Sequence, residues 1–188
     1  MKSNAERPPH QQVEVPPEIE KFIPYGRQWI DEDDIRAIVA VLGSDWLTTG
    51  PQVETFEREF ADFVKGGEAV AVSSGTAALH AAVFASEVGP GDEVIVPSLT
   101  FVATANVVLY QGGTPIFSDV QSDTLLMDPA DVEAKLTQRS KAIIAVDYAG
   151  QPCDYEALRT IAERHGLILI ADACHSLGGS YKKRPVGS

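Results

Sequence analysis

The feature that most constrains the fold is a regular alternation, from Ile23 onward, of short apolar runs with helix-length segments. Five runs are expected to be strands, and they lie at 68–72 (EAVAV), 93–97 (EVIVP), 114–120 (TPIFSDV), 141–147 (KAIIAVD) and 167–172 (LILIAD). The four intervals between them carry helical patterns. Several runs are apolar at consecutive positions, which is typical of strands covered by helices on both faces. The sequence therefore predicts a three-layer α/β/α domain with a mostly parallel sheet.

Two more helices are predicted ahead of the first run. Residues 31–44 place apolar residues on one helical face and acidic residues in the first turn, and Gly43 supplies a stop. Residues 51–64 begin with Pro51 and carry a phenylalanine-rich apolar stripe that ends before two glycines. Residues 1–22 contain paired prolines and no apolar core of a signal peptide, so we expect a flexible arm there and a domain over 23–188.

Composition narrows the classes of function. Fifteen Lys and Arg stand against 27 Asp and Glu, for a net charge of −12. Proteins that bind nucleic acid or anionic membranes broadly need excess cationic side chains, so we expect neither partner. The two cysteines, Cys153 and Cys174, have no zinc spacing and are too few for a disulfide framework. We therefore expect a cytoplasmic protein without a metal, in which any phosphate is held locally.

A candidate phosphate site follows the first apolar run. Ligands of open α/β sheets bind beyond the carboxyl ends of the strands. There, Ser74, Gly75 and Thr76 place hydroxyls and free N–H groups at the start of a helix, which suits one phosphate monoester. The same residues also fit a plain N-cap with a glycine turn. The segment is neither a Walker A loop nor a dinucleotide-binding turn.

Other candidate residues end the remaining runs. The ring of Phe101 would lie either against a flat ligand or in the core. Asp172 comes at the end of the run 167–172, which is expected to be a buried strand, so it either caps the next segment or meets a cation such as the protonated ring nitrogen of a cofactor. His175 would be a site residue or an ordinary loop histidine. Asp119 and Asp147 remain open, because either carboxylate would also serve as a loop cap.

Taken in order, the motifs carry a family resemblance. The segments SSGTAALH (73–80), PSLTFVATANVV (97–108), VDYAGQP (146–152) and ADACHSLGGSY (171–181) make the chain resemble the DegT/DnrJ/EryC-type sugar aminotransferases, which are pyridoxal-phosphate enzymes of fold type I. The resemblance covers nearly everything after the arm. It is greatest to the enzymes that aminate a UDP-linked 4-keto-6-deoxy-N-acetylhexosamine on the route to pseudaminic-acid-like sugars. It implies that residues 23–188 are an incomplete large domain, without its C-terminal part and the small domain.

The resemblance also implies roles for individual residues. The cofactor would be pyridoxal 5'-phosphate, and its binding residues would be Ser74, Gly75, Thr76, Phe101, Asp172 and His175. In the family, the turn holds the phosphate, the aromatic stacks on the pyridine ring, and the aspartate pairs with the ring nitrogen. His175 would lie near the 3-hydroxyl of the ring and is the catalytic candidate. Tyr25, Thr49 and Gly50 fall where family members approach the nucleotide-sugar.

One expected catalytic group has no match in the chain. The resemblance implies that the Schiff-base lysine of the family lies beyond the position of Ser188. Lys182 and Lys183 belong to a stretch that resembles the hairpin leading up to that lysine, so neither is nominated. We therefore expect the chain itself to be inactive, and to expose apolar surface through which it associates.

The implied activity of the intact enzyme is transamination. It would move an amino group from an amino-acid donor, usually glutamate, onto a nucleotide-linked keto-deoxy sugar, as a cytoplasmic homodimer in amino-sugar and surface polysaccharide biosynthesis. Two alternatives stay open. One is a sugar dehydratase of the same family, which carries histidine at the lysine position. The other is a non-catalytic binding or regulatory protein that keeps the phosphate turn.

Overall fold

The computed structural model describes residues 26–188, so the predicted arm at 1–22 and Tyr25 lie outside the described residues. The helices and strands, in chain order, are α1 (Glu32–Leu42), α2 (Pro51–Val64), α3 (Gly75–Ala85), β1 (Glu93–Pro97), α4 (Ala103–Tyr110), β2 (Thr114–Ser118), α5 (Pro129–Ala134), β3 (Ser140–Val146), the 3₁₀ turn η1 (Tyr148–Gly150), α6 (Tyr155–His165), β4 (Ile168–Asp172), β5 (Ser180–Tyr181) and β6 (Arg184–Pro185). They fall into two compact units, 1–47 and 48–188. None of the described helices is long and apolar enough to cross a membrane.

Both helices ahead of the first apolar run form where they were predicted. The Asp31 side chain caps the start of α1 by accepting bonds from two backbone N–H groups of the first turn, and Gly43 caps its end. Pro51 occupies the first turn of α2, where a missing N–H costs nothing. The end of α2 differs from the expectation, because Lys65 rather than a glycine adopts the left-handed conformation at the cap.

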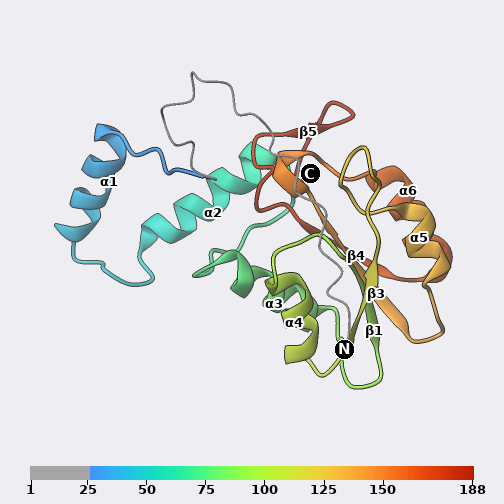
Figure 1. Ribbon diagram of the computed structural model, residues 1–188. Coiled ribbons are helices and arrows are strands. Elements are labelled where there is room, and N and C mark those ends of the chain that lie inside the picture. Colours follow the sequence, from blue (N-terminus) through green and yellow to red (C-terminus); the bar gives the residue numbers. More distant parts are fainter. Residues whose placement is uncertain (1–25) are drawn as a thin grey trace, which may run out of the picture. The chain divides into compact units, whose positions relative to one another are not determined.

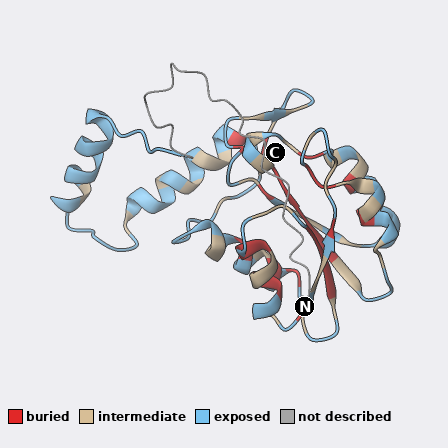
Figure 2. Cartoon of the chain, in the orientation of Figure 1, coloured by how far each residue is buried: buried red, intermediate tan, exposed pale blue. Residues whose placement is uncertain are grey.

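The second unit is built on a four-stranded parallel sheet with the order β2-β1-β3-β4 (Figure 1). All five residues of β1 are buried, as are the last five of β3, whereas β2 and β4 are partly exposed edge strands (Figure 2). The run 167–172 was expected to be a buried strand, and that part of the prediction is wrong. The strand β4 forms, but β3 is its only neighbour in the described sheet.

Successive residues of the inner strands pack on opposite faces of the sheet. On one face, Val94 and Val96 of β1 form a cluster with residues of α3 and α4. On the other face, Ile95 of β1 and Ile143 of β3 pack with residues of α5 and α6. The helix pairs lie on the two sides of the sheet in Figure 1. The predicted three-layer α/β/α architecture with a parallel sheet is therefore confirmed.

The first predicted strand, at 68–72, does not form. The segment has no backbone ladder with any described strand, and Val70 is 80% exposed. The N–H of Ala71 donates instead to the Glu57 carboxylate of α2, at 2.7 Å. Alternating valines favour extended backbone, but a strand also needs a hydrogen-bonded neighbour. Residues 68–72 are thus a segment without strand pairing that leads into α3.

A buried carboxylate holds the amino end of β1. Glu93 accepts hydrogen bonds from the Thr137 hydroxyl and from the Arg139 guanidinium, and its own N–H donates to the Arg139 carbonyl at 2.8 Å. The Thr137 bond and then the Arg139 guanidinium hold the pKa of Glu93 below its usual range. This contact ties the turn before β3 to the first residue of β1.

The Glu93 contact predicts a pH dependence of stability. Because the pKa of Glu93 is lowered on folding, its contribution to the free energy of unfolding is present above the unfolded-state pKa and is lost as the pH falls through the folded-state pKa. The difference in stability between wild type and Glu93→Gln should therefore be largest near neutral pH and narrow in acid. Denaturant titrations between about pH 7 and about pH 3 measure it. Glu68→Gln, in the exposed approach to α3, is the control, and a Glu93→Gln difference that is constant with pH would contradict the prediction.

Candidate functional site

The three segments singled out in the sequence meet at the carboxyl edge of the sheet. The hydroxyl of Thr104, in the first turn of α4, donates to the Asp172 carboxylate at the end of β4, at 3.2 Å. The hydroxyl oxygen of Thr104 is also 2.8 Å from the hydroxyl oxygen of Thr100. A Cβ atom at Gly75, the first residue of α3, would lie 2.9 Å from the sulfur of Cys174, so these two residues are in close contact. The starts of α3 and α4 and the loop after β4 are therefore neighbours.

Asp172 is a buried carboxylate without a cation. The residue is 7% exposed, and its oxygens accept bonds from the Thr104 hydroxyl and, at 3.4 Å, from the Cys174 N–H. No ion pair within residues 26–188 includes Asp172. The Cys174 bond makes Asp172 a local cap, as one interpretation of the sequence had it. Neutral donors only partly offset the cost of burying a carboxylate, so the position favours a cation.

The start of α3 is both an N-cap and an anion-binding geometry. The Ser74 side chain accepts from the Ala77 N–H at 3.1 Å, and the Ser74 carbonyl accepts from the Ala78 N–H. The N–H groups of Gly75 and Thr76 make no hydrogen bond within the described residues. They lie at the positive end of the helix dipole, which favours an anion. The cap and the phosphate turn proposed from the sequence are therefore compatible.

The two ring side chains of the candidate site are exposed. Phe101, in the loop after β1, is 71% exposed, so the interpretation that places its ring in the core is wrong. An exposed aromatic ring at this edge of the sheet is available to a flat ligand. His175 is also exposed, and its ring approaches the edge of Tyr148 with the centroids 6.5 Å apart. Both rings lie in loops that leave the carboxyl ends of strands.

Asp147 and Asp119 also follow strands, and they differ sharply. Asp147 is 1% exposed and accepts three hydrogen bonds, from the Tyr155 and Ser176 hydroxyls at 2.7 Å and from the Cys153 N–H at 2.9 Å. Asp119 is exposed and caps its own loop by accepting from the next N–H. The cap interpretation holds for Asp119, whereas Asp147 does more. Its partner Ser176 is 29 residues away in the sequence, so the spacing of motifs could not have predicted this hydrogen bond.

The expected nucleotide-sugar residues lie at the start of α2. Gly50 is the N-cap of the helix, and Thr49 adopts a left-handed backbone with φ of 45°. That conformation strains a β-branched residue, and such strain tends to occur at functional positions. Within the described residues, no hydrogen bond joins Thr49 or Gly50 to Asp172. Their role in substrate binding stays a prediction, as does that of Tyr25.

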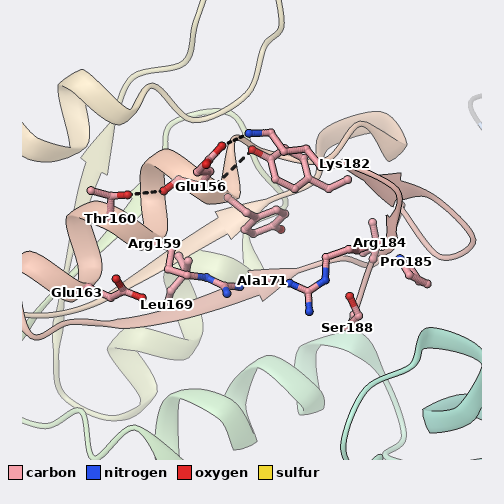
Figure 3. Close-up of a pocket in the computed structure, with 14 residues that line it drawn as sticks. Glu156, Arg159, Thr160, Glu163, Leu169, Ala171, Lys182, Arg184, Pro185 and Ser188 are labelled. Carbon is pink, nitrogen blue, oxygen red and sulfur yellow. Dashed lines mark hydrogen bonds and ion pairs between the residues drawn. The ribbon is translucent and has the colours of Figure 1, made fainter.

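A cavity of about 480 Å³ lies elsewhere, between α6, β4 and the β5–β6 hairpin (Figure 3). Its charged lining includes Glu156, which forms an ion pair with Lys182, and Arg159 and Arg184. None of the site residues expected from the sequence lines it. The motifs singled out in the sequence lie instead at the carboxyl edge of the sheet, so we place the candidate site there.

The two cysteines differ in their protonation chemistry. Burial, together with the hydrogen bond and charge of Asp172, raises the pKa of Cys174 to about 11. Burial and the Asp147 carboxylate raise the pKa of Cys153 to about 12, and its thiol is fully buried. The exposed Cys174 is therefore the accessible thiol, and its reactivity reports on the Asp172 carboxylate.

The family comparison agrees with the resemblance seen in the sequence. Residues 28–188 match the DegT/DnrJ/EryC1/StrS aminotransferase family. The spore coat polysaccharide biosynthesis protein SpsC of Bacillus subtilis is 46% identical over 167 residues, which are 89% of this chain and 43% of SpsC. This chain thus spans less than half the length of that relative.

Solved structures of aminotransferases share the fold. The putative sugar aminotransferase Spr1654 of Streptococcus pneumoniae, solved in a PLP-form, superposes with a TM-score of 0.85 at 36% identity, over 88% of this chain and 46% of Spr1654. Helicobacter pylori PseC, an aminotransferase involved in the biosynthesis of pseudoaminic acid, gives a TM-score of 0.82 at 31% identity, over 88% of this chain and 45% of PseC. The described sheet and its helices therefore have the fold of these enzymes.

The contact between Cys174 and Asp172 predicts a change in thiol reactivity. Asp172→Asn removes the charge that helps raise the pKa of Cys174, so that pKa falls and the thiolate fraction near pH 9 rises. Cys174 should then react several-fold faster with iodoacetamide, by about 3- to 10-fold. Rates against pH, with peptide mass spectrometry to identify the modified cysteine, measure the effect. Asp119→Asn is the matched control, and an unchanged Cys174 profile in Asp172→Asn would refute the contact.

Proposed function

Because the chain belongs to the DegT/DnrJ/EryC1/StrS aminotransferase family, we propose that it forms the cofactor-binding part of a pyridoxal-phosphate-dependent sugar aminotransferase. The single observation that carries the proposal is the buried carboxylate of Asp172, which forms no ion pair within residues 26–188 and lies beside the N-terminus of α3. A cofactor with a cationic ring nitrogen at one end and a phosphate at the other matches both features.

Each end of the site has residues that fit the cofactor. Asp172 would hold the proton on the ring nitrogen, with the Thr104 hydroxyl fixing one carboxylate oxygen. The free N–H groups of Gly75 and Thr76, together with the Ser74 hydroxyl, would bind the phosphate without any basic side chain. The net charge of −12 is therefore no obstacle to an anionic cofactor.

The remaining residues act on the faces of the ring. Phe101 offers an exposed aromatic surface on which the ring would stack. His175 would approach the 3-hydroxyl and hold or release a proton there. When bound, pyridoxal phosphate supplies a ring that accepts the electron pair released when a proton leaves the amino-bearing carbon. By keeping the ring nitrogen protonated, Asp172 strengthens that property.

The substrate class rests on the relatives. The names of SpsC and PseC tie them to polysaccharide and pseudoaminic acid biosynthesis. We propose that the intact enzyme, of which this chain forms the cofactor-binding part, transfers an amino group from an amino-acid donor onto a nucleotide-linked keto-deoxy sugar. The strained Thr49 and the adjacent Gly50 would approach the nucleotide-sugar from the start of α2.

Cofactor binding tests the proposal. Pyridoxamine 5'-phosphate is the probe, because it has the same ring and phosphate but forms no bond with surface lysines. Asp172→Asn should weaken its binding by about 10- to 100-fold, the range for losing a charged hydrogen bond. Phe101→Ala should weaken it by about 10-fold, through lost stacking. Equilibrium dialysis measures both dissociation constants.

Two control variants make the binding test specific. Asp119→Asn removes an exposed carboxylate at another strand end, and Phe117→Ala removes an exposed aromatic ring from edge strand β2. Neither should alter binding of the probe. The proposal fails if the wild type does not bind the probe, or if each control weakens binding as much as its site counterpart.

We also propose that the protein works as a homodimer. The apolar stripe of α2 is solvent-exposed at Val53, Phe56 and Phe63, as expected of a surface that is covered in an assembly. Phe56→Glu with Phe63→Glu should shift the protein from an associated to a monomeric species in sedimentation velocity. Glu59→Gln, also on α2, is the control. A wild type that sediments as a monodisperse monomer would contradict the proposal.

A further inference from the structure

The carboxylate of Asp147 lies at the centre of a buried network that joins two loops. On one oxygen it accepts from the Cys153 N–H, in the segment between β3 and α6, and from the hydroxyl of Tyr155, the first residue of α6. On the other oxygen it accepts from the Ser176 hydroxyl, in the loop after β4. The first two bonds are local, whereas the third crosses 29 residues of sequence. One oxygen thus binds groups close in sequence, and the other binds the loop that carries the candidate site residues Asp172 and His175.

The backbone of Asp147 also holds the start of the same loop. Its N–H donates to the carbonyl of Asp172, at 3.0 Å. Asp147 therefore fixes the loop at both ends, at residue 172 through the main chain and at Ser176 through the side chain. His175 lies between these two points. A loop tied at both ends over so few residues has little freedom to move its side chains.

A glycine packs the middle of this loop. Gly150 has a φ of 88°, and a Cβ atom there would lie 3.0 Å from the carbonyl oxygen of His175. The backbone of the segment after β3 therefore lies directly against the backbone of His175, and the position needs glycine both for its conformation and for its space. Together with the Asp147 bonds, this contact makes residues 147–153 a support for residues 172–176.

The hydroxyl groups that donate to Asp147 are buried or keep their protons, so their hydrogen bonds to the carboxylate are stable. Ser176 is 2% exposed, and its hydroxyl is 2.7 Å from the carboxylate but 3.3 Å from the Ala173 carbonyl, so the carboxylate is the nearer acceptor. Burial and the Asp147 carboxylate raise the pKa of Tyr155, so its phenol keeps the proton that it donates. Bonds from neutral donors to a carboxylate are stronger than those between neutral groups.

We propose that Asp147 is a positioning residue, which holds Asp172 and His175 in place by tying Ser176 to the end of β3. The inference rests on the proposed function, because it is in cofactor binding that the placement of Asp172 and His175 matters. Asp147 itself is 1% exposed, and both of its oxygens accept hydrogen bonds from the protein. Its effect on the site is therefore exerted through the loop.

The test uses two readouts on the protein expressed from its gene. One is the rate at which iodoacetamide modifies Cys174 without cofactor, which reports the loop geometry, and the other is the dissociation constant of pyridoxamine 5'-phosphate. Ser176→Ala should raise the Cys174 rate and weaken binding, each by about 10-fold, the scale of one lost hydrogen bond to a charged group. Tyr155→Phe removes a donor to the other oxygen of Asp147 and leaves the bond from Ser176 in place. It should therefore leave both readouts within about 2-fold.

Variants of Asp147 add a rescue arm. Asp147→Asn can donate to the Ser176 oxygen while still accepting from the local donors, so both readouts should stay close to wild type. Asp147→Ala removes all three side-chain bonds and keeps the main-chain bond to Asp172, so it should act at least as strongly as Ser176→Ala. Val132→Ala, at the buried position of α5, is the control for lost stability alone and should not change the Cys174 rate.

The outcomes separate this inference from the proposed function. If wild type does not bind the cofactor probe, the proposed function fails, while the Cys174 rates still test the tie between the two loops. If wild type binds the probe but Ser176→Ala changes neither readout, the positioning role is wrong. It is also wrong if Val132→Ala, at a matched melting temperature, speeds Cys174 modification as much as Ser176→Ala. These arms hold even where Asp147→Ala does not fold.

Discussion

Parallel pairing of the inner strands is the constraint on which the candidate site depends. In the sheet order β2-β1-β3-β4, every strand ends at the same edge, and the buried residues of β1 and β3 fix the register. Val146 pairs with Asp172, which places the residue after β3 beside the last residue of β4. The loops that leave these strands therefore all lie at one edge of the sheet. Polar side chains at that edge become neighbours although they are far apart in the sequence.

Two buried aspartates at this edge differ in the hydrogen bonds that their carboxylates accept. Asp147 is buried and accepts bonds from three donors on its two oxygens. Asp172 is almost as buried, but within the described residues it accepts longer bonds, at 3.2 Å from the Thr104 hydroxyl and at 3.4 Å from the nearby Cys174 N–H. A buried carboxylate with so few donors is costly unless a ligand contributes positive charge. One aspartate thus stabilises the loop, and the other remains available to a cofactor.

The sequence predicted the layers and most of the elements, because apolar periodicity reports directly on which faces are buried. It failed at 68–72, since strand propensity does not reveal whether a neighbouring strand is present, and it took the edge strand β4 for a buried one. At the site, Asp172, Phe101 and the turn at Gly75 could be named from their places after apolar runs. The bond from Ser176 to Asp147 could not, because it depends on how two loops fold together.

The central claim is that Asp172 keeps the ring nitrogen of a bound cofactor protonated. Nitrogen-15 NMR of ring-labelled pyridoxal phosphate bound to the protein tests it directly, because the chemical shift distinguishes a protonated from a neutral pyridine nitrogen. We expect a protonated nitrogen at neutral pH in the wild type and a neutral one in Asp172→Asn. A neutral nitrogen in the wild type, or a protonated nitrogen that survives the substitution, would contradict it.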